Sequence, residues 1–276
     1  MTDQTQLFQD AAPIQVVDVG ASAIEDEPAY KDLLATGLAN VTGFEPSPEQ
    51  YDVLKGMESD TARYLPYALG DGTQQELKIC RAPGMTSLYE PDMDLLCHFH
   101  GFEDWAVVEE RLLLETHRLD DITEIESVDF IKIDAQGAEY QIIHNGRTKI
   151  SDAVVLEAEL SFRPIYKGER PYADVETLLR ELGLQVHMFS KVNRRAFRPL
   201  IFNNSKFEGL HHILQVDVVF IKDVTLLADL SPQQLLKMAA ILHYCYGSVD
   251  AAMLALRHYD EQSGTGFATQ SAQSLS

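Results

Sequence analysis

The stretch Val-Asp-Phe-Ile-Lys-Ile-Asp-Ala-Gln-Gly-Ala-Glu, residues 128–139, predicts a strand, a turn and a helix in succession. Its apolar run ends at Asp134, Gly137 follows in the turn, and Glu139 lies near the start of the expected helix, where the helix dipole favours an acidic side chain. In an open α/β sheet, ligands bind just beyond the carboxyl ends of the strands. We therefore expect Asp134 to lie beside a bound ligand.

A second stretch near the N-terminus has the same order of features. Residues 14–21 read Ile-Gln-Val-Val-Asp-Val-Gly-Ala, an apolar strand that carries Asp18 and turns at Gly20. Further strands alternate with helices, which predicts an α/β fold with a doubly wound, mostly parallel sheet. The last two strands are joined without a long helix, so we expect an antiparallel hairpin at one edge. The other expected strands are 40–44, 62–68, 74–80, 153–160, 184–189 and 215–221, and the helices between them are 28–36, 48–57, 138–145 and 172–182.

Composition divides the chain into four parts. The helices expected after residue 226 could pack on the sheet or on a second copy of the chain, which leaves a homodimer open. The tail is rich in Ser, Gln, Gly and Thr, a composition typical of disorder. The parts are a flexible leader (1–12), a main α/β domain (13–225), a small helical extension (226–260) and a disordered tail (261–276).

The charge balance excludes several classes of partner. The 276 residues include 43 acidic and 22 basic side chains, a net charge of -21. Such a surface repels phosphate backbones, so we expect no nucleic-acid partner, and it disfavours simple docking on anionic membranes. No apolar run is long enough for stable membrane insertion. The three cysteines are widely spaced and the N-terminus is polar, which argues against a disulfide framework and a secretory signal and favours a cytoplasmic location.

The turn after the first strand indicates which cofactor the sheet could hold. It has one glycine, Gly20, followed by Ala21, and lacks both G-x-G-x-x-G and a Walker loop, so a pyrophosphate has no cradle there. Asp18 and the acidic residues 25–27 suit a cationic ligand. S-adenosylmethionine carries a sulfonium and an ammonium group and no phosphate, and Asp18 could meet its amino-acid part.

Two later strand ends complete this nucleoside site. Glu45 follows the second strand, where a carboxylate can accept hydrogen bonds from both ribose hydroxyls. Ala68 and Leu69, with Asp71 close behind, end the third strand, where adenine would lie. Each acidic residue taken alone could equally be a helix cap.

At this point the residues resemble a known family. The stretch 128–139 is similar to the signature of FkbM-type S-adenosylmethionine-dependent methyltransferases, and the similarity extends over about residues 14–222. It implies a class I methyltransferase fold, S-adenosylmethionine as cofactor, and methyl transfer to a hydroxyl oxygen of a sugar, glycoconjugate or other secondary metabolite. One departure is Ile-Glu-Asp-Glu at 24–27, where most members have a second small residue. Further similar blocks are 43–46, 67–72, 83–88, 156–159 and 164–168.

The strand at 128–134 carries the two candidate catalytic residues. Asp134 could act as the base that takes the acceptor's hydroxyl proton, contact the cofactor amine, or only cap the following helix. Lys132 lies inside an apolar strand and needs a buried partner, either Asp134 or another carboxylate at a strand end. That ion pair could be structural or catalytic.

The acceptor side is less clearly marked. Glu157 and Glu159 are two residues apart, so both face one side of their strand. Binding to substrate hydroxyls, metal binding and salt bridges to Arg163 or Arg195 all remain open, and we assign no metal ligand. Tyr166 and His211 are further candidates for contact with the substrate.

Three functions compete on these features. The first is an O-methyltransferase acting on a small-molecule or saccharide acceptor. The second is a degenerate S-adenosylmethionine-binding protein with an interaction or regulatory role, which the departure at 24–27 motivates. An NAD-dependent oxidoreductase is disfavoured because the pyrophosphate loop is missing.

Overall fold

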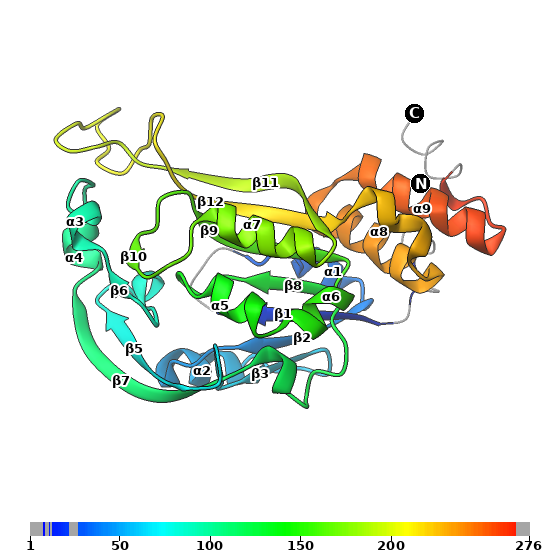
Figure 1. Cartoon of the computed structure of the whole chain (residues 1–276), viewed down its shortest axis with the longest axis horizontal. Coiled ribbons are helices and arrows are strands. Elements are labelled where there is room, and N and C mark those ends of the chain that lie inside the picture. Colours follow the sequence, from blue (N-terminus) through cyan, green and yellow to red (C-terminus); the bar gives the residue numbers. More distant parts are fainter. Residues whose placement is uncertain (1–7, 9–10, 12, 22–26, 269–276) are drawn as a thin grey trace.

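A seven-stranded sheet forms the centre of the computed structural model, which describes residues 8, 11, 13–21 and 27–268 (Figure 1). Its strand order is β11-β12-β9-β8-β1-β2-β3. Five neighbouring strands, β9, β8, β1, β2 and β3, are parallel, whereas β12 runs antiparallel to both β9 and β11. The predicted α/β fold with an antiparallel edge hairpin is confirmed. The strands are β1 (Ile14–Val19), β2 (Ala39–Phe44), β3 (Ala62–Leu65), β8 (Phe130–Ile133), β9 (Val155–Ser161), β11 (Leu184–Arg194) and β12 (Ile213–Lys222).

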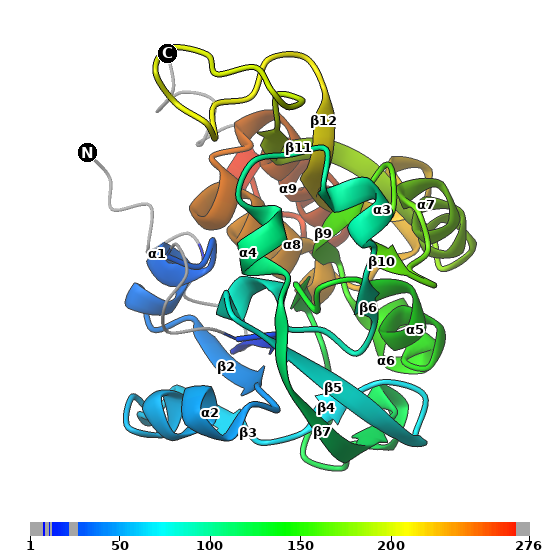
Figure 2. The same ribbon diagram turned by 90° about the vertical axis from the view of Figure 1, so that its left-hand side faces the viewer.

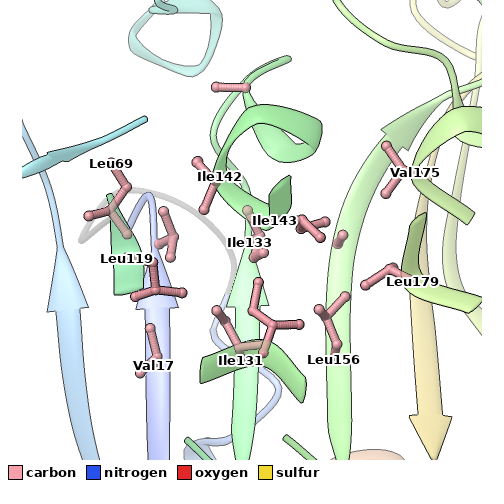
Figure 3. Close-up of a cluster of buried hydrophobic side chains, with 14 of the residues drawn as sticks. Val17, Leu69, Leu119, Ile131, Ile133, Ile142, Ile143, Leu156, Val175 and Leu179 are labelled. Carbon is pink, nitrogen blue, oxygen red and sulfur yellow. The ribbon is translucent and has the colours of Figure 1, made fainter. Parts of the chain in front are cut away.

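Helices cover both faces of this sheet because its inner strands are apolar on both sides. Alternate residues of β1 show the division: Val17 and Val19 belong to one buried cluster, and Ile14 and Val16 to the other. Figure 3 shows the first cluster between the sheet and its helices. Its helices are α5 (Glu139–His144), α6 (Arg147–Asp152) and α7 (Tyr172–Glu181); the opposite face carries α1 (Lys31–Ala35), α8 (Pro232–Tyr246) and α9 (Val249–Ser263), and α2 (Pro48–Lys55) packs beside β3.

The third predicted strand, 62–68, is divided in the structure. β3 ends at Leu65, and Pro66 follows, which lacks the N–H that a continuing ladder would need. Ala68–Leu69 forms β4, which pairs with β7 in a separate three-stranded sheet. The predicted strand Gln74–Cys80 is β5 with the expected bounds, but it also pairs with β7. The remaining elements are η2 (Pro83–Met85), β6 (Glu90–Pro91), α3 (Met93–Leu96), α4 (Phe102–Trp105), β7 (Val108–His117), η3 (Leu119–Asp121), β10 (Tyr166–Lys167) and η4 (Val224–Asp229).

The C-terminal helices pack on the sheet of their own chain. Leu235, Leu236 and Ile241 of α8 are completely buried. α9 continues to Ser263, so the first three residues of the expected tail are helical, and residues 269–276 lie outside the described part. Of the expected leader, the structure describes Phe8 and Ala11, and the Phe8 ring is buried 5.7 Å from that of Tyr244. No helix in the described ranges is long and apolar enough to cross a bilayer.

The central core makes a quantitative prediction. Leu156 of β9 is completely buried in the first cluster, so Leu156→Ala should lower the free energy of unfolding by about 2–5 kcal/mol through lost burial and a residual cavity. Urea denaturation measures this loss. Leu113→Ala is the matched control because that leucine, on β7, is 61% exposed, and equal losses in the two variants would contradict the assigned core.

Candidate functional site

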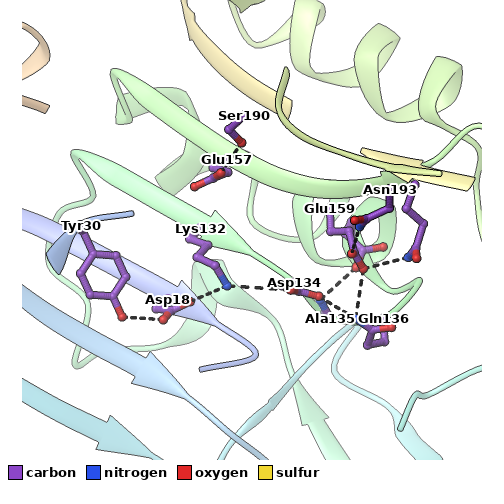
Figure 4. A network of polar contacts seen from close by, with 12 residues as sticks. Asp18, Tyr30, Lys132, Asp134, Ala135, Gln136, Glu157, Glu159, Ser190 and Asn193 are labelled. Atoms are coloured by element: carbon purple, nitrogen blue, oxygen red, sulfur yellow. Dashed lines mark hydrogen bonds and ion pairs between the residues drawn. The ribbon is translucent and has the colours of Figure 1, made fainter. Parts of the chain in front are cut away.

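Charged side chains form a row across three adjacent parallel strands. In the ladder, Asp18 of β1 lies opposite Lys132 of β8, and Lys132 lies opposite Glu157 of β9. Lys132 Nζ is 3.6 Å from Asp18 Oδ1 and 4.0 Å from Asp134 Oδ2 (Figure 4). The expectation that Lys132 has a carboxylate partner is confirmed, with two carboxylates in place of one.

Asp18 also has a hydrogen-bond partner in Tyr30, the residue directly before α1. The Tyr30 hydroxyl donates a 2.6 Å hydrogen bond to Asp18 Oδ2, and the carboxylate is only 3% exposed. Burial, with Asp18 close by, raises the pKa of Tyr30 well above its usual value, so the phenol remains a donor. Asp18 is therefore part of a buried polar arrangement with Tyr30 and Lys132.

The carboxyl ends of β1 and β8 touch through their backbones at Gly20. This residue has a φ of +79°, and a Cβ placed on it would lie 1.9 Å from the carbonyl oxygen of Asp134. The amide of Gly20 donates to the carbonyl of Phe44 at the end of β2. Only glycine fits this position, since any side chain would push the Asp134 turn away.

The turn after Asp134 is organised by Gln136. Its φ is 49°, a left-handed conformation that a non-glycine residue adopts at a cost of roughly 1–3 kcal/mol. Gln136 Nε2 donates to Asp134 Oδ1 at 2.8 Å and to Glu159 Oε2 at 3.1 Å. The Tyr166 hydroxyl donates to Gln136 Oε1 at 2.9 Å. One amide therefore joins the ends of β8 and β9.

The Glu139 side chain binds the backbone of the same turn. Its Oε1 accepts hydrogen bonds from the amides of Ala135 and Gly137, at 2.9 and 3.1 Å. Burial, together with the nearby Glu169 carboxylate, raises the pKa of Glu139 to about 8. The backbone of the turn is thus tied to a carboxyl group that is largely neutral at pH 7.

The two glutamates of β9 accept hydrogen bonds from neutral side chains. Ser190 and Tyr246 donate to Glu157 at 2.7 and 2.9 Å. Gln215 donates to Glu159 at 2.8 Å, alongside the bond from Gln136. These contacts hold both carboxylates on the same side of β9, as their spacing predicted.

Two cavities meet at this network. The first, of about 410 Å³, opens beyond the ends of β1 and β2, and its inner part is apolar. Four carboxylates and one guanidinium line it, which gives it negative character. Its lining residues include Gly20, Phe44, Glu45, Glu49, Tyr67, Ala68, Leu69, Leu77, Arg81, Glu109, Asp134, Gln136 and Ile142.

The second cavity, of about 740 Å³, lies over the charged row on the other side of Asp134. Asp217 of β12 lines it, and burial, with Asp134 and Glu157 nearby, raises the pKa of Asp217 to about 6. Aromatic side chains of α4 lie at its far wall. Its lining residues include Asp18, Ala21, Tyr30, Phe102, Trp105, Lys132, Asp134, Gln136, Glu157, Glu159, Ser190, Lys191, Asn193, Arg195, Gln215 and Asp217.

The structure brings most of the predicted site residues to these cavities. Asp134 lines both of them. The first cavity receives Gly20, Glu45, Ala68 and Leu69, and the second receives Asp18, Ala21, Lys132, Glu157 and Glu159. Asp18 thus lies on the side away from the proposed nucleoside position. The altered loop at 24–27 is outside the described residues except for Glu27.

Three predicted residues line neither cavity. Asp71 is exposed and its Oδ1 accepts hydrogen bonds from Thr73 and Gln75 of its own turn, which lower its pKa. Tyr166 is buried behind Gln136 and acts on the site through that amide. His211 is exposed in the loop between β11 and β12. Their direct roles in binding remain predictions.

Sequence reasoning missed the partners that hold the carboxylates. Gln136 was read only as part of a turn, and Tyr30 has no local signal that pairs it with Asp18, twelve residues away. Gln215 and Asp217 could have been found, because polar residues alternate with valines in a strand that is otherwise apolar.

The family model described as "Methyltransferase FkbM domain" matches residues 18–186, more than half of the chain. The chain belongs to the FkbM methyltransferase family. Its strand order, with an antiparallel strand next to the edge, is that of the class I methyltransferase fold, and the family uses S-adenosylmethionine as cofactor. No curated protein sequence matches the chain.

Solved methyltransferase structures are similar at low identity. Magnesium protoporphyrin IX methyltransferase (ChlM) from Synechocystis PCC 6803, with bound SAM, is 8% identical, with a TM-score of 0.40 over 80% of this chain and 75% of that one. A putative tRNA (m1A22) methyltransferase from Streptococcus pneumoniae is 12% identical, with a TM-score of 0.37 over 95% and 98%.

The first cavity fits S-adenosylmethionine by its chemistry. Phe44, Leu69 and Ile142 supply an apolar wall for a purine, and Glu45 lies beside it at the end of β2. One Glu45 oxygen accepts a hydrogen bond from the Ser47 amide, which fixes the carboxylate at the cavity. The excess of carboxylates in the lining suits a ligand with two positive charges and no phosphate.

Gly20 gives a test of this cofactor site. In Gly20→Ala, the added Cβ would displace the Asp134 turn, so we expect calorimetry with S-adenosylhomocysteine, the demethylated product, to show at least tenfold weaker binding, roughly the 1.4 kcal/mol that defines a factor of ten. Gly37→Ala is matched for backbone strain, with a φ of +76° and no atom near the new Cβ. Wild-type affinity in the Gly20 variant would contradict the assigned contact.

Glu139 predicts a pH dependence of stability. Because its folded pKa of about 8 exceeds the usual 4.5, folding favours the neutral acid, and that contribution is lost as pH rises from about 4.5 through 8. Glu139→Gln stays neutral, so its free energy of unfolding should rise relative to wild type by about 1 kcal/mol per pH unit in this window. Urea denaturation at pH 5.5 and 7.5 measures the difference. A difference that does not change with pH would rule out the raised pKa.

Proposed function

We propose that this protein is an O-methyltransferase that transfers a methyl group from S-adenosylmethionine to a hydroxyl oxygen of a small-molecule or saccharide acceptor in the cytoplasm. The acceptor class is a sugar, a glycoconjugate or a secondary metabolite. The observation that carries this proposal is the position of Asp134, which lines both cavities. A carboxylate there can face the cofactor's methyl group from one side and the acceptor's hydroxyl from the other.

The first cavity would hold the cofactor through residues of three strand ends. Ala68 and Leu69 would contact the adenine, Glu45 the ribose hydroxyls, and the backbone at Gly20 the methionine part. S-adenosylmethionine supplies an electrophilic methyl group on a sulfonium. The protein's main contribution is then alignment, which can account for roughly 7–11 kcal/mol of a barrier.

Asp134 is the proposed general base. The Asp134 carboxylate would take the proton of the acceptor hydroxyl, whose oxygen would receive the methyl group that S-adenosylmethionine supplies when bound. Such a base contributes about 10²–10⁴-fold to the rate. Gln136 holds one Asp134 oxygen at 2.8 Å and Lys132 attracts the other at 4.0 Å, so the carboxylate has a fixed direction.

The second cavity suits a polyhydroxylated acceptor. Glu157 and Glu159 are acceptors for hydroxyl groups, and Asn193 and Gln215 are amides that can donate or accept. Trp105 adds an apolar surface at the same cavity. This mixture of carboxylates, amides and one indole can hydrogen-bond the hydroxyls of a sugar ring while packing on its carbon atoms.

Asp134→Asn tests the base. The amide keeps the size of the side chain but cannot take the proton, so we expect kcat to fall about 10²–10⁴-fold with little change in cofactor affinity. The assay is transfer of a labelled methyl group over a panel of sugars, glycolipids and small alcohols, with calorimetry for the cofactor. Asp152→Asn is the control, because Asp152 is exposed at the end of α6 and lines neither cavity.

Asp217 is the alternative base, because it lines the second cavity and burial raises its pKa to about 6; Asp217→Asn separates it from Asp134. If that variant loses turnover and Asp134→Asn does not, Asp217 is the base and our assignment is wrong. Binding of S-adenosylmethionine by the wild-type protein without transfer to any acceptor of the panel would favour the degenerate binding protein. If neither S-adenosylmethionine nor its product binds, both functions fail.

A further inference from the structure

The loop between β11 and β12, residues 195–212, extends away from the sheet. Figure 1 and Figure 2 both show it at the outer edge of the molecule, beyond the ends of the two strands. Its tip is a tight turn in which Asn203 and Asn204 have φ angles of 48° and 58°, closed by reciprocal backbone hydrogen bonds between Phe202 and Ser205. We call residues 200–207 the loop tip.

The loop tip exposes large apolar side chains. Leu200, Ile201, Phe202 and Phe207 are between 36% and 50% exposed, although each is a residue that folding normally buries. Phe197, which precedes the tip, is 49% exposed. Five exposed large apolar side chains within eleven residues are the kind of feature that is found at sites of interaction with another molecule or with a membrane.

The base of the loop is anchored, so this exposure is built into the fold. The ring of Phe197 stacks on Phe99 at 5.1 Å, and Phe207 lies 5.0 Å from Trp105 of α4. The amide of Arg198 donates to the carbonyl of His98, and Arg198 also pairs with Glu103 at 2.9 Å. The loop is thus held against α3 and α4 while its tip faces outward.

The charge of the loop is opposite to that of the whole protein. Residues 194–212, which are the loop and the last residue of β11, contain four basic side chains and one acidic one, Glu208, whereas the whole chain carries 43 acidic and 22 basic residues. Arg194 and Lys206 are exposed on either arm of the loop. An acidic body with one basic projection has an electrostatic polarity that orients the projection toward a negatively charged surface. The basic residues are Arg194, Arg195, Arg198 and Lys206.

We propose that the loop tip is a peripheral docking element for the surface of an anionic lipid bilayer. Leucine, isoleucine and phenylalanine side chains would enter the boundary between headgroups and acyl chains, while Arg194 and Lys206 would meet lipid phosphates. The combination of an apolar tip with basic arms favours lipid over an apolar protein surface, which would not require the positive charge.

The position of the loop relates this surface to the second cavity. Arg195 at the base of the loop and Trp105 beneath Phe207 both line that cavity. A bilayer touching the loop tip would therefore lie near the cavity that we assign to the acceptor. The docking proposal itself does not depend on methyl transfer and can be tested on the protein without cofactor.

Vesicle binding tests the proposal directly. In sedimentation assays, we expect the full chain to bind vesicles of phosphatidylglycerol and phosphatidylcholine. Its affinity should be lower by about tenfold or more for vesicles of phosphatidylcholine alone, and for the mixed vesicles in 0.5 M salt. Replacing the tip by Leu200→Ser, Ile201→Ser and Phe202→Ser should weaken binding by about tenfold or more. Arg194→Glu with Lys206→Glu should have a similar effect on the anionic vesicles.

Matched controls separate the loop from exposed apolar residues in general. Val224→Ser with Leu226→Ser alters two side chains of η4 that are each 40% exposed, and should leave vesicle binding unchanged. In the Phe202→Trp variant, brominated acyl chains should quench the fluorescence of the new tryptophan. The wild-type protein, whose one tryptophan is Trp105, gives the background signal. Circular dichroism checks that the tip variants fold.

Three outcomes would overturn the proposal. The first is no binding to anionic vesicles by the folded wild-type protein. The second is binding that survives the tip substitutions unchanged. The third is self-association of the wild-type chain in sedimentation velocity that the tip variant abolishes without any vesicle binding, which would assign the loop tip to a second copy of the chain.

Discussion

The structure depends on the register between β1, β8 and β9. This register places Asp18, Lys132 and Glu157 side by side on three adjacent buried strands. Lys132 would be costly inside an apolar sheet without partners, and removal of both Asp18 and Asp134 would take away the two carboxylates that face its charge. A slip of one residue would also turn Lys132 toward the cluster that contains Ile131 and Ile133. The ion pairs and the hydrophobic pattern therefore enforce the same register.

The sequence was sufficient where local pattern and tertiary contacts agree. β1 and β5 have the predicted bounds, and Asp134 follows directly on β8 as expected. It was insufficient where partners are distant in the chain. β5 joins β7 instead of the main sheet, and Asp71 lies in an exposed turn that lines neither cavity. Only long-range packing decides which sheet a strand joins and which carboxylate reaches a cavity.

Average composition also concealed a local feature. A net charge of -21 argued against docking on anionic membranes, and that argument remains valid for the body of the protein. Charges separated by more than a Debye length, about 10 Å at 0.1 M salt, act almost independently. The loop from 195 to 212 projects from the sheet, so its three basic side chains, with the adjoining Arg194, dominate the charge of its immediate surroundings (Figure 1).

Asp134 contacts its surroundings through its backbone on one side and through its carboxylate on the other. Its backbone carbonyl lies against Gly20 and fixes the distance between the ends of β1 and β8. Its carboxylate is held by Gln136 and Lys132, and the residue as a whole lines both cavities. The strained φ of Gln136 follows from this division, because its amide must reach both Asp134 and Glu159 while the chain turns into α5. The strained backbone of Gln136 thus allows its side-chain amide to fix the direction of the Asp134 carboxylate.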